Sequence, residues 1–266
     1  MHWKRMTVNE IRQYLQQESS LSEGMLEALE RDPRRTVARM VAQYRRRCRQ
    51  MEEQREHVVH LLAQENALRQ AGYSFVAGVD EAGRGALAGP VVAAAVLFPP
   101  GVFIPQVDDS KKLTAKQRQQ LFHKIKRTAL GVATVAIDAQ TIDELNILQA
   151  TYLAMGQALG KLVPQPDHCL VDGYPVPTIA MEQTAVVGGD RTCFSIAAAS
   201  IVAKVVRDEI MLQLARAYPQ YGFARNKGYC TREHRQALKT YGPSPEHRRC
   251  FRPVAEAGQL SIPWKE

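Results

Sequence analysis

The stretch GVDEAGRGALAGPVV, residues 78–92, places two adjacent acids, Asp80 and Glu81, directly after an apolar run. The apolar residues 75–79 predict a buried strand. Two carboxylates at such a position repel each other, which raises their pKa values, and a divalent cation would relieve that repulsion. Strand side chains alternate between faces, so the acids can share one ion only where the strand ends or distorts, as the following glycines permit. The stretch therefore predicts a cation site, with a turn carrying two solvated acids as the alternative.

The glycine-flanked arginine of this stretch indicates a second function, the binding of a phosphate or a sugar. Without a Cβ at Gly83 and Gly85, backbone amides can approach such a ligand closely, and Arg84 offers a planar fork of donors. A dinucleotide-binding loop is a weaker interpretation, because the spacing is G-x-G-x-x-x-G and a strand candidate, not a helix, follows the glycines.

The composition of the chain predicts a globular protein with an anionic partner. Its 266 residues suit one full domain plus an appendage, and a hydrophobic content of 45% is enough for a core. The net charge of +8 favours nucleic acid over a membrane surface as the partner. Five cysteines without C-x-x-C spacing imply neither a disulfide framework nor a zinc site. With no apolar signal region and no run long enough to span a bilayer, we expect a cytoplasmic protein without membrane attachment.

Residues 1–71 differ from residues 72–266 in composition and pattern, because they are rich in Arg, Gln and Glu and lack strand-like runs. Thr7 and Glu10 have capping-box spacing, and apolar periodicity predicts further helices over residues 22–30 and from Arg35 toward Leu68. We therefore expect a small all-α extension that strengthens substrate binding. Its basic cluster could contact a phosphate backbone or form a solvated helix face; it consists of Arg45, Arg46, Arg47 and Arg49.

The remaining 195 residues, 72–266, read as an α/β domain. Two strands, residues 74–79 and 91–98, are joined by the short glycine segment and are predicted to pair antiparallel. A third strand is predicted over residues 131–137. Helices are predicted over residues 115–128, capped by Thr114, over residues 147–162, and over residues 195–217.

Two further acids stand where apolar runs end, as Asp80 does. Asp172 closes the run His168–Asp172, and Asp190 follows Ala185, Val186 and Val187 with two glycines between. Such strand ends can converge at one edge of a sheet. Lys204 lies on the apolar helix over residues 195–217, where burial of its charge needs a partner, and we expect one of these acids to be that partner.

The segment 221–252 carries 8 Lys and Arg against 2 Asp and Glu, interleaved with aromatic residues such as Tyr229. Phosphate contacts combined with stacking on sugar or base are one interpretation, and a basic surface over a packed aromatic cluster is the other. His234 and His247 could serve as general bases, but nothing in the sequence places them near the acids, so we expect structural or phosphate-facing roles.

With these motifs assembled, the sequence closely resembles the ribonuclease HII family. The resemblance covers roughly residues 73–254 and rests on several motifs in order: GVDEAGRGALAGPVVAAAV at 78–96, DDSKKLT at 108–114, VDG at 171–173, GGD at 188–190 with SIAAASIVAK at 195–204, NKGYCTREH at 226–234 and YGPSPEHRRCF at 241–251. Two residues depart from the family pattern, Ala86 in place of proline and Val206 in place of threonine, and neither affects a carboxylate. The helical extension looks like that of firmicute-type members.

The resemblance implies a ribonuclease H-like fold, a mixed five-stranded sheet flanked by helices. It implies an endonuclease that cuts the RNA strand of RNA/DNA hybrids and cleaves 5′ of single ribonucleotides in duplex DNA, acting as a monomer with two Mg²⁺ or Mn²⁺ ions. The implied catalytic and metal-binding residues are Asp80, Glu81, Asp172 and Asp190. The candidate substrate-binding residues are Gly83, Arg84, Gly85, Tyr229, Lys204, Ser110 and Lys111. A nucleic-acid binding module without catalysis and a phosphotransferase of related fold are the alternatives.

Overall fold

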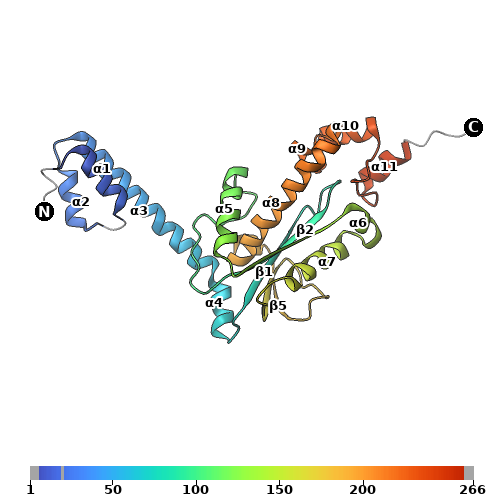
Figure 1. The fold of residues 1–266 in the computed structure, drawn as a ribbon, viewed down its shortest axis with the longest axis horizontal. Helices are drawn as coiled ribbons and strands as arrows, with labels where there is room; N and C mark the ends of the chain where they lie inside the picture. Colours follow the sequence, from blue (N-terminus) through green and yellow to red (C-terminus); the bar gives the residue numbers. More distant parts are fainter. Residues whose placement is uncertain (1–5, 19–20, 261–266) are drawn as a thin grey trace, which may run out of the picture. The chain divides into compact units, whose positions relative to one another are not determined.

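The computed structural model describes residues 6–18 and 21–260. Contacts between residues divide the chain into two compact units, Met1–Val59 and His60–Glu266. The N-terminal unit is helical, and the second unit contains the β-sheet (Figure 1). No helix in the described ranges combines the length and the apolar character that crossing a bilayer requires.

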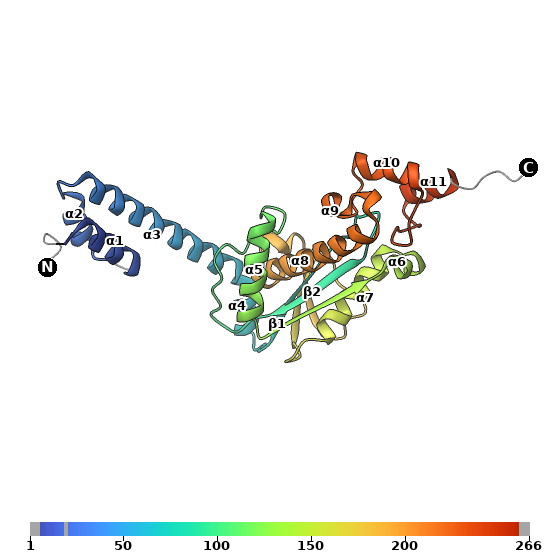
Figure 2. The ribbon, with the colours of Figure 1, turned by 45° about the horizontal axis from the view of Figure 1, so that its top comes forward.

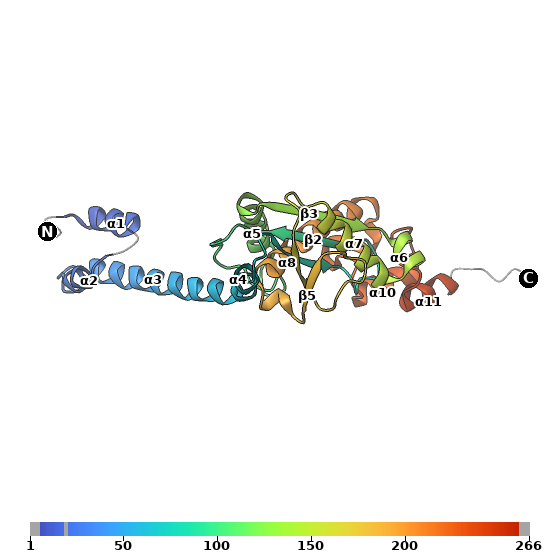
Figure 3. The same cartoon turned by 90° about the horizontal axis from the view of Figure 1, so that it is seen from below.

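The described residues of the N-terminal unit form the helices α1 (Val8–Gln17), α2 (Glu23–Glu30) and α3 (Arg35–Leu61), the last of which ends just beyond the unit's boundary. The predicted capping box is present, because Thr7 and Glu10 each accept a hydrogen bond from the other's backbone N–H. Figure 3 shows α1 beside the first part of α3. A small apolar core holds these helices together; it consists of Ile11, Leu15, Leu26, Leu29, Val37, Val41 and Tyr44.

The helix expected to run from Arg35 toward Leu68 is interrupted at Leu62, and α4 (Ala63–Gln70) follows the break. Leu68 of α4 packs against the apolar cluster that includes strand residues Val76 and Leu170, so α4 belongs to the second unit. The expected boundary between residues 71 and 72 thus separates α4 from the first strand, whereas contacts divide the chain before α4.

Five strands form one mixed sheet, which confirms the predicted fold class. They are β1 (Val76–Ala82), β2 (Val91–Leu97), β3 (Gly131–Ile137), β4 (His168–Asp172) and β5 (Glu182–Val186). The order across the sheet is β3-β2-β1-β4-β5. β1 and β2 are antiparallel, as predicted, while β1 and β4 are parallel. The central strand β1 therefore has a neighbour that carries no acid on one side and a neighbour that ends in Asp172 on the other.

Helices cover both faces of this sheet, because almost every residue of its central strands is apolar (Figure 2). One face packs on α7, and the opposite face packs on α8. At Gly78 of β1, an added Cβ would overlap the backbone of Ser195 on α8, so glycine allows the helix to approach closely. The helices of this part of the chain are α5 (Ala115–Thr128), α6 (Ala139–Leu145), α7 (Ile147–Gly160) and α8 (Phe194–Ala217).

The basic segment after α8 is a packed helical region. Its elements are the 3₁₀ helix η3 (Pro219–Tyr221), α9 (Phe223–Asn226), α10 (Arg232–Tyr241) and α11 (Arg252–Leu260). Tyr221 and Phe223 are buried and stack on each other, with His234 and His247 against them. Tyr229, by contrast, is 37% exposed. The packed-aromatic interpretation is therefore confirmed for Tyr221 and Phe223, while substrate contact by Tyr229 stays a prediction.

Candidate active site

Asp80 and Glu81 lie inside β1 rather than after it. The strand continues to Ala82, and its ladder with β2 pairs Asp80 with Ala94 and Glu81 with Ala93. The prediction that the strand ends at the two acids is therefore wrong, because β2 offers an unbroken apolar partner for the whole of β1. Asp80 is only 4% exposed, and by alternation it shares the α8 face of the sheet with Gly78.

Asp172 reaches Asp80 through the parallel pairing of β1 and β4. Val79 is paired with Val171, so the next residue on each strand is an acid. The backbone N–H of Gly189 donates to Oδ1 of Asp172 over 2.7 Å. This bond ties the end of β4 to the segment that carries the fourth acid.

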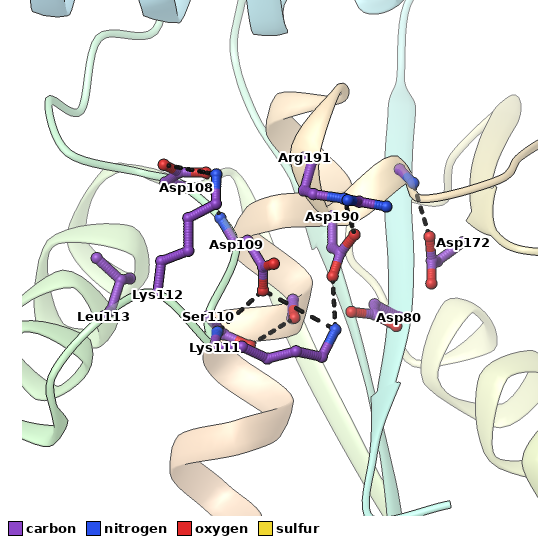
Figure 4. Close-up of polar contacts among 12 residues, drawn as sticks. Asp80, Asp108, Asp109, Ser110, Lys111, Lys112, Leu113, Asp172, Asp190 and Arg191 are labelled. Atoms are coloured by element: carbon purple, nitrogen blue, oxygen red, sulfur yellow. Dashed lines mark hydrogen bonds and ion pairs between the residues drawn. The ribbon is translucent and has the colours of Figure 1, made fainter.

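Asp190 does not follow a strand directly, contrary to the prediction. β5 ends at Val186, and Asp190 lies in the 3₁₀ helix η2 (Gly189–Arg191). Gly188 precedes this helix with φ +70°, a conformation that favours glycine. The turn buries Asp190 and brings it to the region where Asp80 and Asp172 lie (Figure 4).

Burial and mutual repulsion act together on these acids. The pKa of Asp80 is raised well above its usual value, first by burial and then by the charges of Glu81 and Asp172, against a hydrogen bond from Ser200. Burial also raises the pKa of Glu81, opposed by Arg84, whose Nη1 lies 3.6 Å from Glu81 Oε1. The pKa of Asp172 is raised by burial and by Asp190. A cation at this place would be stabilised by all of them.

Lys111 supplies a positive charge to the cluster. Its Nζ lies 2.8 Å from Oδ2 of Asp190 and 3.9 Å from Oδ1 of Asp109 (Figure 4). The hydrogen bond to Asp190 raises the pKa of Lys111. The side chain is 79% exposed, so the same ammonium is also accessible from solvent.

Ser110 lies behind the acids rather than on the surface. It is 4% exposed, and its hydroxyl is 2.9 Å from that of Ser200, which in turn bonds to Asp80. This chain of hydroxyls orients Asp80 from α8. Ser110 therefore acts on the site through Ser200.

The expectation that Lys204 pairs with one of the acids at the strand ends is wrong. Its Nζ lies 2.7 Å from Oδ1 of Asp208, one turn further along α8, because the helix places residues four apart on one face. Lys204 also lies 5.7 Å above the ring of Tyr229. The lysine therefore belongs to the surroundings of Tyr229.

Known proteins match both parts of the chain. A family model described as "Ribonuclease HII" matches residues 77–254, and one described as "Ribonuclease HII N-terminal domain" matches residues 7–69. The chain belongs to the ribonuclease HII family. It is a hydrolase, a nuclease of the ribonuclease H type that acts on nucleic acid.

Relatives named ribonuclease HII resemble most or nearly all of the chain. A ribonuclease HII of Geobacillus sp. (strain WCH70) is 42% identical over 98% of this chain and 94% of its own length. A ribonuclease HII of Geobacillus thermodenitrificans is 45% identical over 96% of this chain and 98% of its own. That of Thermosynechococcus vestitus is 56% identical over 71% of this chain and 89% of its own.

Solved structures of related enzymes share the fold. The ribonuclease H2 of Pyrococcus horikoshii aligns with a TM-score of 0.59 at 27% identity, covering 70% of this chain and 97% of its own. Bst-RNase HIII, solved in complex with Mn²⁺, aligns with a TM-score of 0.54 at 21% identity over 73% of this chain and 72% of its own. The second likeness concerns the fold only.

The ribonuclease HII acids fit a divalent cation in their chemistry. All four offer carboxylate oxygens, the ligands that Mg²⁺ and Mn²⁺ prefer, and three of them have a raised pKa that a cation would reverse. Within the described ranges, however, no three His, Cys, Asp or Glu side chains are arranged so that they could already hold a metal ion. A cation at this site would have to draw the carboxylates closer together.

The segment Gly83–Gly89 of this ribonuclease HII, here called the glycine loop, brings Arg84 to the edge of the acid cluster. Gly83 has φ +90°, and an added Cβ would overlap the side chain of Arg207. Nothing lies within 4 Å of a Cβ placed on Gly85, so that position is open to a ligand. The Arg84 side chain is 48% exposed. The loop thus has one closed side and one accessible side.

Sequence analysis missed two residues that form the closed side, Arg207 and Arg248. Both are fully buried. Arg207 donates to the carbonyls of Ala88, Pro90 and Lys227, and Arg248 to those of Gly89 and Arg84. Arg207 also lies 5.2 Å from the Tyr229 ring centroid. A signal was available for Arg207, because it lies on the same apolar helix that drew attention to Lys204.

Proposed function

We propose that this ribonuclease hydrolyses the RNA strand of RNA/DNA hybrids and cleaves on the 5′ side of single ribonucleotides embedded in duplex DNA. Such cleavage would leave 3′-hydroxyl and 5′-phosphate ends. The observation that carries the proposal is the position of Arg84, whose guanidinium lies 3.6 Å from Glu81 of the acid cluster. Groups suited to a sugar hydroxyl and a phosphate therefore adjoin the groups suited to phosphodiester hydrolysis.

We propose that two Mg²⁺ or Mn²⁺ ions are held by the four acids, Asp80, Glu81, Asp172 and Asp190. Bound there, the ions would make a water molecule more nucleophilic and stabilise the departing 3′ oxygen. The chain's own part is to orient the ligands. Ser200, backed by Ser110, holds Asp80, and the N–H of Gly189 holds Asp172. Lys111 neutralises Asp190 and is exposed enough to contact a substrate phosphate.

Selection of the substrate is assigned to the glycine loop and Tyr229. Backbone amides at Gly83 and Gly85 would bind the ribose 2′-hydroxyl and the adjoining phosphate, with Arg84 donating to that phosphate. Tyr229 would pack on the following deoxyribose, and the charges of Lys204 and Arg207 near its ring support this position. A ribonucleotide followed by a deoxyribonucleotide would satisfy both parts at once.

A cleavage assay tests the proposal directly. A DNA duplex with one ribonucleotide is incubated with the full chain, with Mg²⁺, with Mn²⁺ and without a divalent cation. We expect a single cut 5′ of the ribonucleotide that requires a cation, and no cut by Asp80→Asn or Asp172→Asn, which keep their shape but lose a charge. A near-full rate in either variant contradicts the ligand assignment, and an uncut duplex contradicts the function.

The role of Arg84 is tested with two substrates. Arg84→Ala should lose about tenfold or more in rate on the single-ribonucleotide duplex, the worth of one charge-assisted hydrogen bond, and less on a continuous RNA/DNA hybrid. An equal loss on both substrates contradicts a sensing role. We further propose that the protein acts in the cytoplasm and that it is a monomer. Sedimentation of the full chain would check the monomeric state.

A further inference from the structure

A polar cleft of about 840 Å³ lies within the N-terminal unit, between α1 and α3. Figure 3 shows these two helices side by side. Eight of the lining residues are polar and three are apolar, and none is acidic. The lining residues are Arg12, Gln16, Thr36, Arg39, Gln43, Arg46, Arg47, Gln50, Leu15, Met40 and Tyr44. This part of the chain therefore concentrates hydrogen-bond donors and positive charge in one hollow.

The other side of the same unit has a different charge pattern. A second cleft of similar size, about 850 Å³, has acids among its arginines. Its acids are Glu18, Glu23 and Glu52. Arg45, which lines that cleft, is bound to both Glu23 and Glu30. Arg47 lines both clefts, and Arg46 also lines a smaller hollow together with Glu30 and Glu53. The acids of this unit therefore lie near some of the α3 arginines, but none of them lines the first cleft itself.

The arginines of the first cleft keep their donors available. The side chains of Arg39 and Arg46 make no hydrogen bond or ion pair with any residue that the structure describes. Arg12 makes one hydrogen bond, of 2.8 Å, to Asn9 on its own helix. Arg47 differs: it donates to the carbonyl of Leu15 over 2.7 Å and lies 5.2 Å from the Tyr44 ring centroid. Arg47 joins the two walls, while the other three guanidiniums are available to a ligand.

We propose that this cleft binds the phosphate backbone of the duplex on which the enzyme acts. Guanidinium, amide and hydroxyl groups are the donors that proteins use toward phosphate oxygens, and no acid in the cleft would repel them. The stripe from Arg39 to Gln50 extends about 16 Å at ~1.5 Å per residue, which matches roughly five nucleotides of one strand at ~3.4 Å each. The contacts carry no base selectivity. The proposal rests on the proposed function only for the identity of the duplex.

A second binding surface on one chain raises affinity without touching the chemistry. Once the catalytic unit is bound to a duplex, the linked cleft meets that duplex at a high effective concentration. Binding of the cleft first would likewise raise the effective concentration of duplex at the catalytic unit. The expected signature is therefore a change in binding and in KM, with the rate at saturating substrate unchanged. Other polyanions, such as an anionic lipid surface, would meet the same charges, so the experiment includes one.

The experiment compares two double variants of the full chain. Arg12→Ala/Arg39→Ala removes one charge from each wall of the cleft. Arg49→Ala/Arg55→Ala removes two exposed arginines that line the second cleft, and it serves as the matched control. Binding of a fluorescein-labelled 20-bp DNA duplex is measured without divalent cation over a series of salt concentrations. Cleavage of the single-ribonucleotide duplex is measured separately with Mg²⁺.

We expect the cleft variant to bind about tenfold more weakly at 0.1 M salt and to show a salt slope shallower by about 2, since each phosphate contact contributes about 0.9. The control should bind as the unaltered chain does. Equal losses in both variants, or none in either, overturn the proposal. So does unchanged duplex binding combined with lost binding to phosphatidylglycerol vesicles. If the unaltered chain binds but does not cut, the proposed function fails while the cleft proposal survives.

Discussion

Arg207 and Arg248 place two guanidiniums in the interior, and no carboxylate in the described part of the chain is hydrogen-bonded to either. Burial lowers the pKa of both, and the charge of Arg207 further lowers the pKa of Arg248, to about 9. Their donors are used on backbone carbonyls of the glycine loop and of Lys227. The free energy of burying these charges is offset by fixing a loop that has almost no side chains of its own to pack.

Replacement of Arg207 by alanine should lower the free energy of unfolding by about 3 kcal/mol, because two buried carbonyls and one half-buried carbonyl lose their donor and a cavity is left. Arg249→Ala, which alters an exposed neighbour of Arg248, should change it by less than about 0.5 kcal/mol. Urea unfolding of both variants checks this. A similar stability of the two would show that the loop holds its shape without Arg207.

His234 and His247 form a buried pair whose tautomers follow from their partners. Nδ1 of His247 accepts from the N–H of Ser244 over 3.0 Å, so its Nε2 carries the proton and donates to Nε2 of His234 over 2.9 Å. Nδ1–H of His234 then donates to the carbonyl of Tyr229. Tyr229, which we propose contacts the substrate, is thus hydrogen-bonded through its carbonyl to a pair of histidines that must both be neutral.

This pair should make stability depend on pH. Burial, and the neighbouring His234, lower the pKa of His247 to about 4, and burial lowers that of His234. A lowered folded-state pKa means that the unfolded chain binds the proton first, so stability is complete above about pH 6.5 and falls as pH drops toward 4. The loss from His247 alone should approach about 3 kcal/mol.

The matching variant is His247→Asn, whose amide oxygen can still accept from Ser244 but whose side chain cannot ionise. Its thermal midpoint should fall less between pH 7 and pH 4.5 than that of the unaltered chain. Parallel pH profiles for the two proteins would show that other groups cause the acid sensitivity. His123→Gln, at an exposed site on α5, should not alter the profile.

At the scale of elements, α8 lacks a cap of its own and receives one from α4. Cys193 at its N-cap makes no side-chain hydrogen bond to the helix. Glu65 instead accepts from the N–H and the hydroxyl of Ser195, over 2.8 and 2.7 Å. Ser195 abuts Gly78, two residues before Asp80, so the cap lies close to the acid-bearing strand.

Glu65→Ala should destabilise the fold by about 2 kcal/mol, the upper range for loss of an N-cap. Glu65→Gln should be at least as stable as the unaltered chain, because it keeps an acceptor and removes a charge whose pKa is raised by burial. Chemical unfolding at pH 7 separates the two. A glutamine variant as unstable as the alanine variant would mean that the charge itself is needed.

At the scale of the whole molecule, the division before α4 determines where the extension can be removed. A chain of residues 60–266 keeps Glu65 and Leu68, which pack on the second unit. It should bind duplex at least about tenfold more weakly, because the whole cleft is removed, and cleave at an unchanged saturated rate. A chain of residues 72–266 loses the cap of α8 and should in addition unfold more easily. Thermal unfolding and cleavage kinetics of the two truncations check this; equal stability would contradict it.

The sequence by itself determined the family and, through the family motifs, the fold class. It also singled out Asp80, Glu81, Asp172 and Asp190 as candidates, because local signals surround them: apolar runs, glycines and motif spacing act over a few residues. The elements around them could be predicted for the same reason, as with the capped helix after Thr114 and the antiparallel pair at residues 74–98.

Only the tertiary structure decided how distant residues meet. The register of β1 with β4 sets Asp172 beside Asp80. Lys204 pairs with Asp208, whereas Lys111 and Arg191 are the cations beside Asp190. Arg207 and Arg248 hold the glycine loop from positions more than 100 residues away along the chain. Such contacts depend on packing and on burial of charge, which long-range geometry sets and no local pattern of residues encodes.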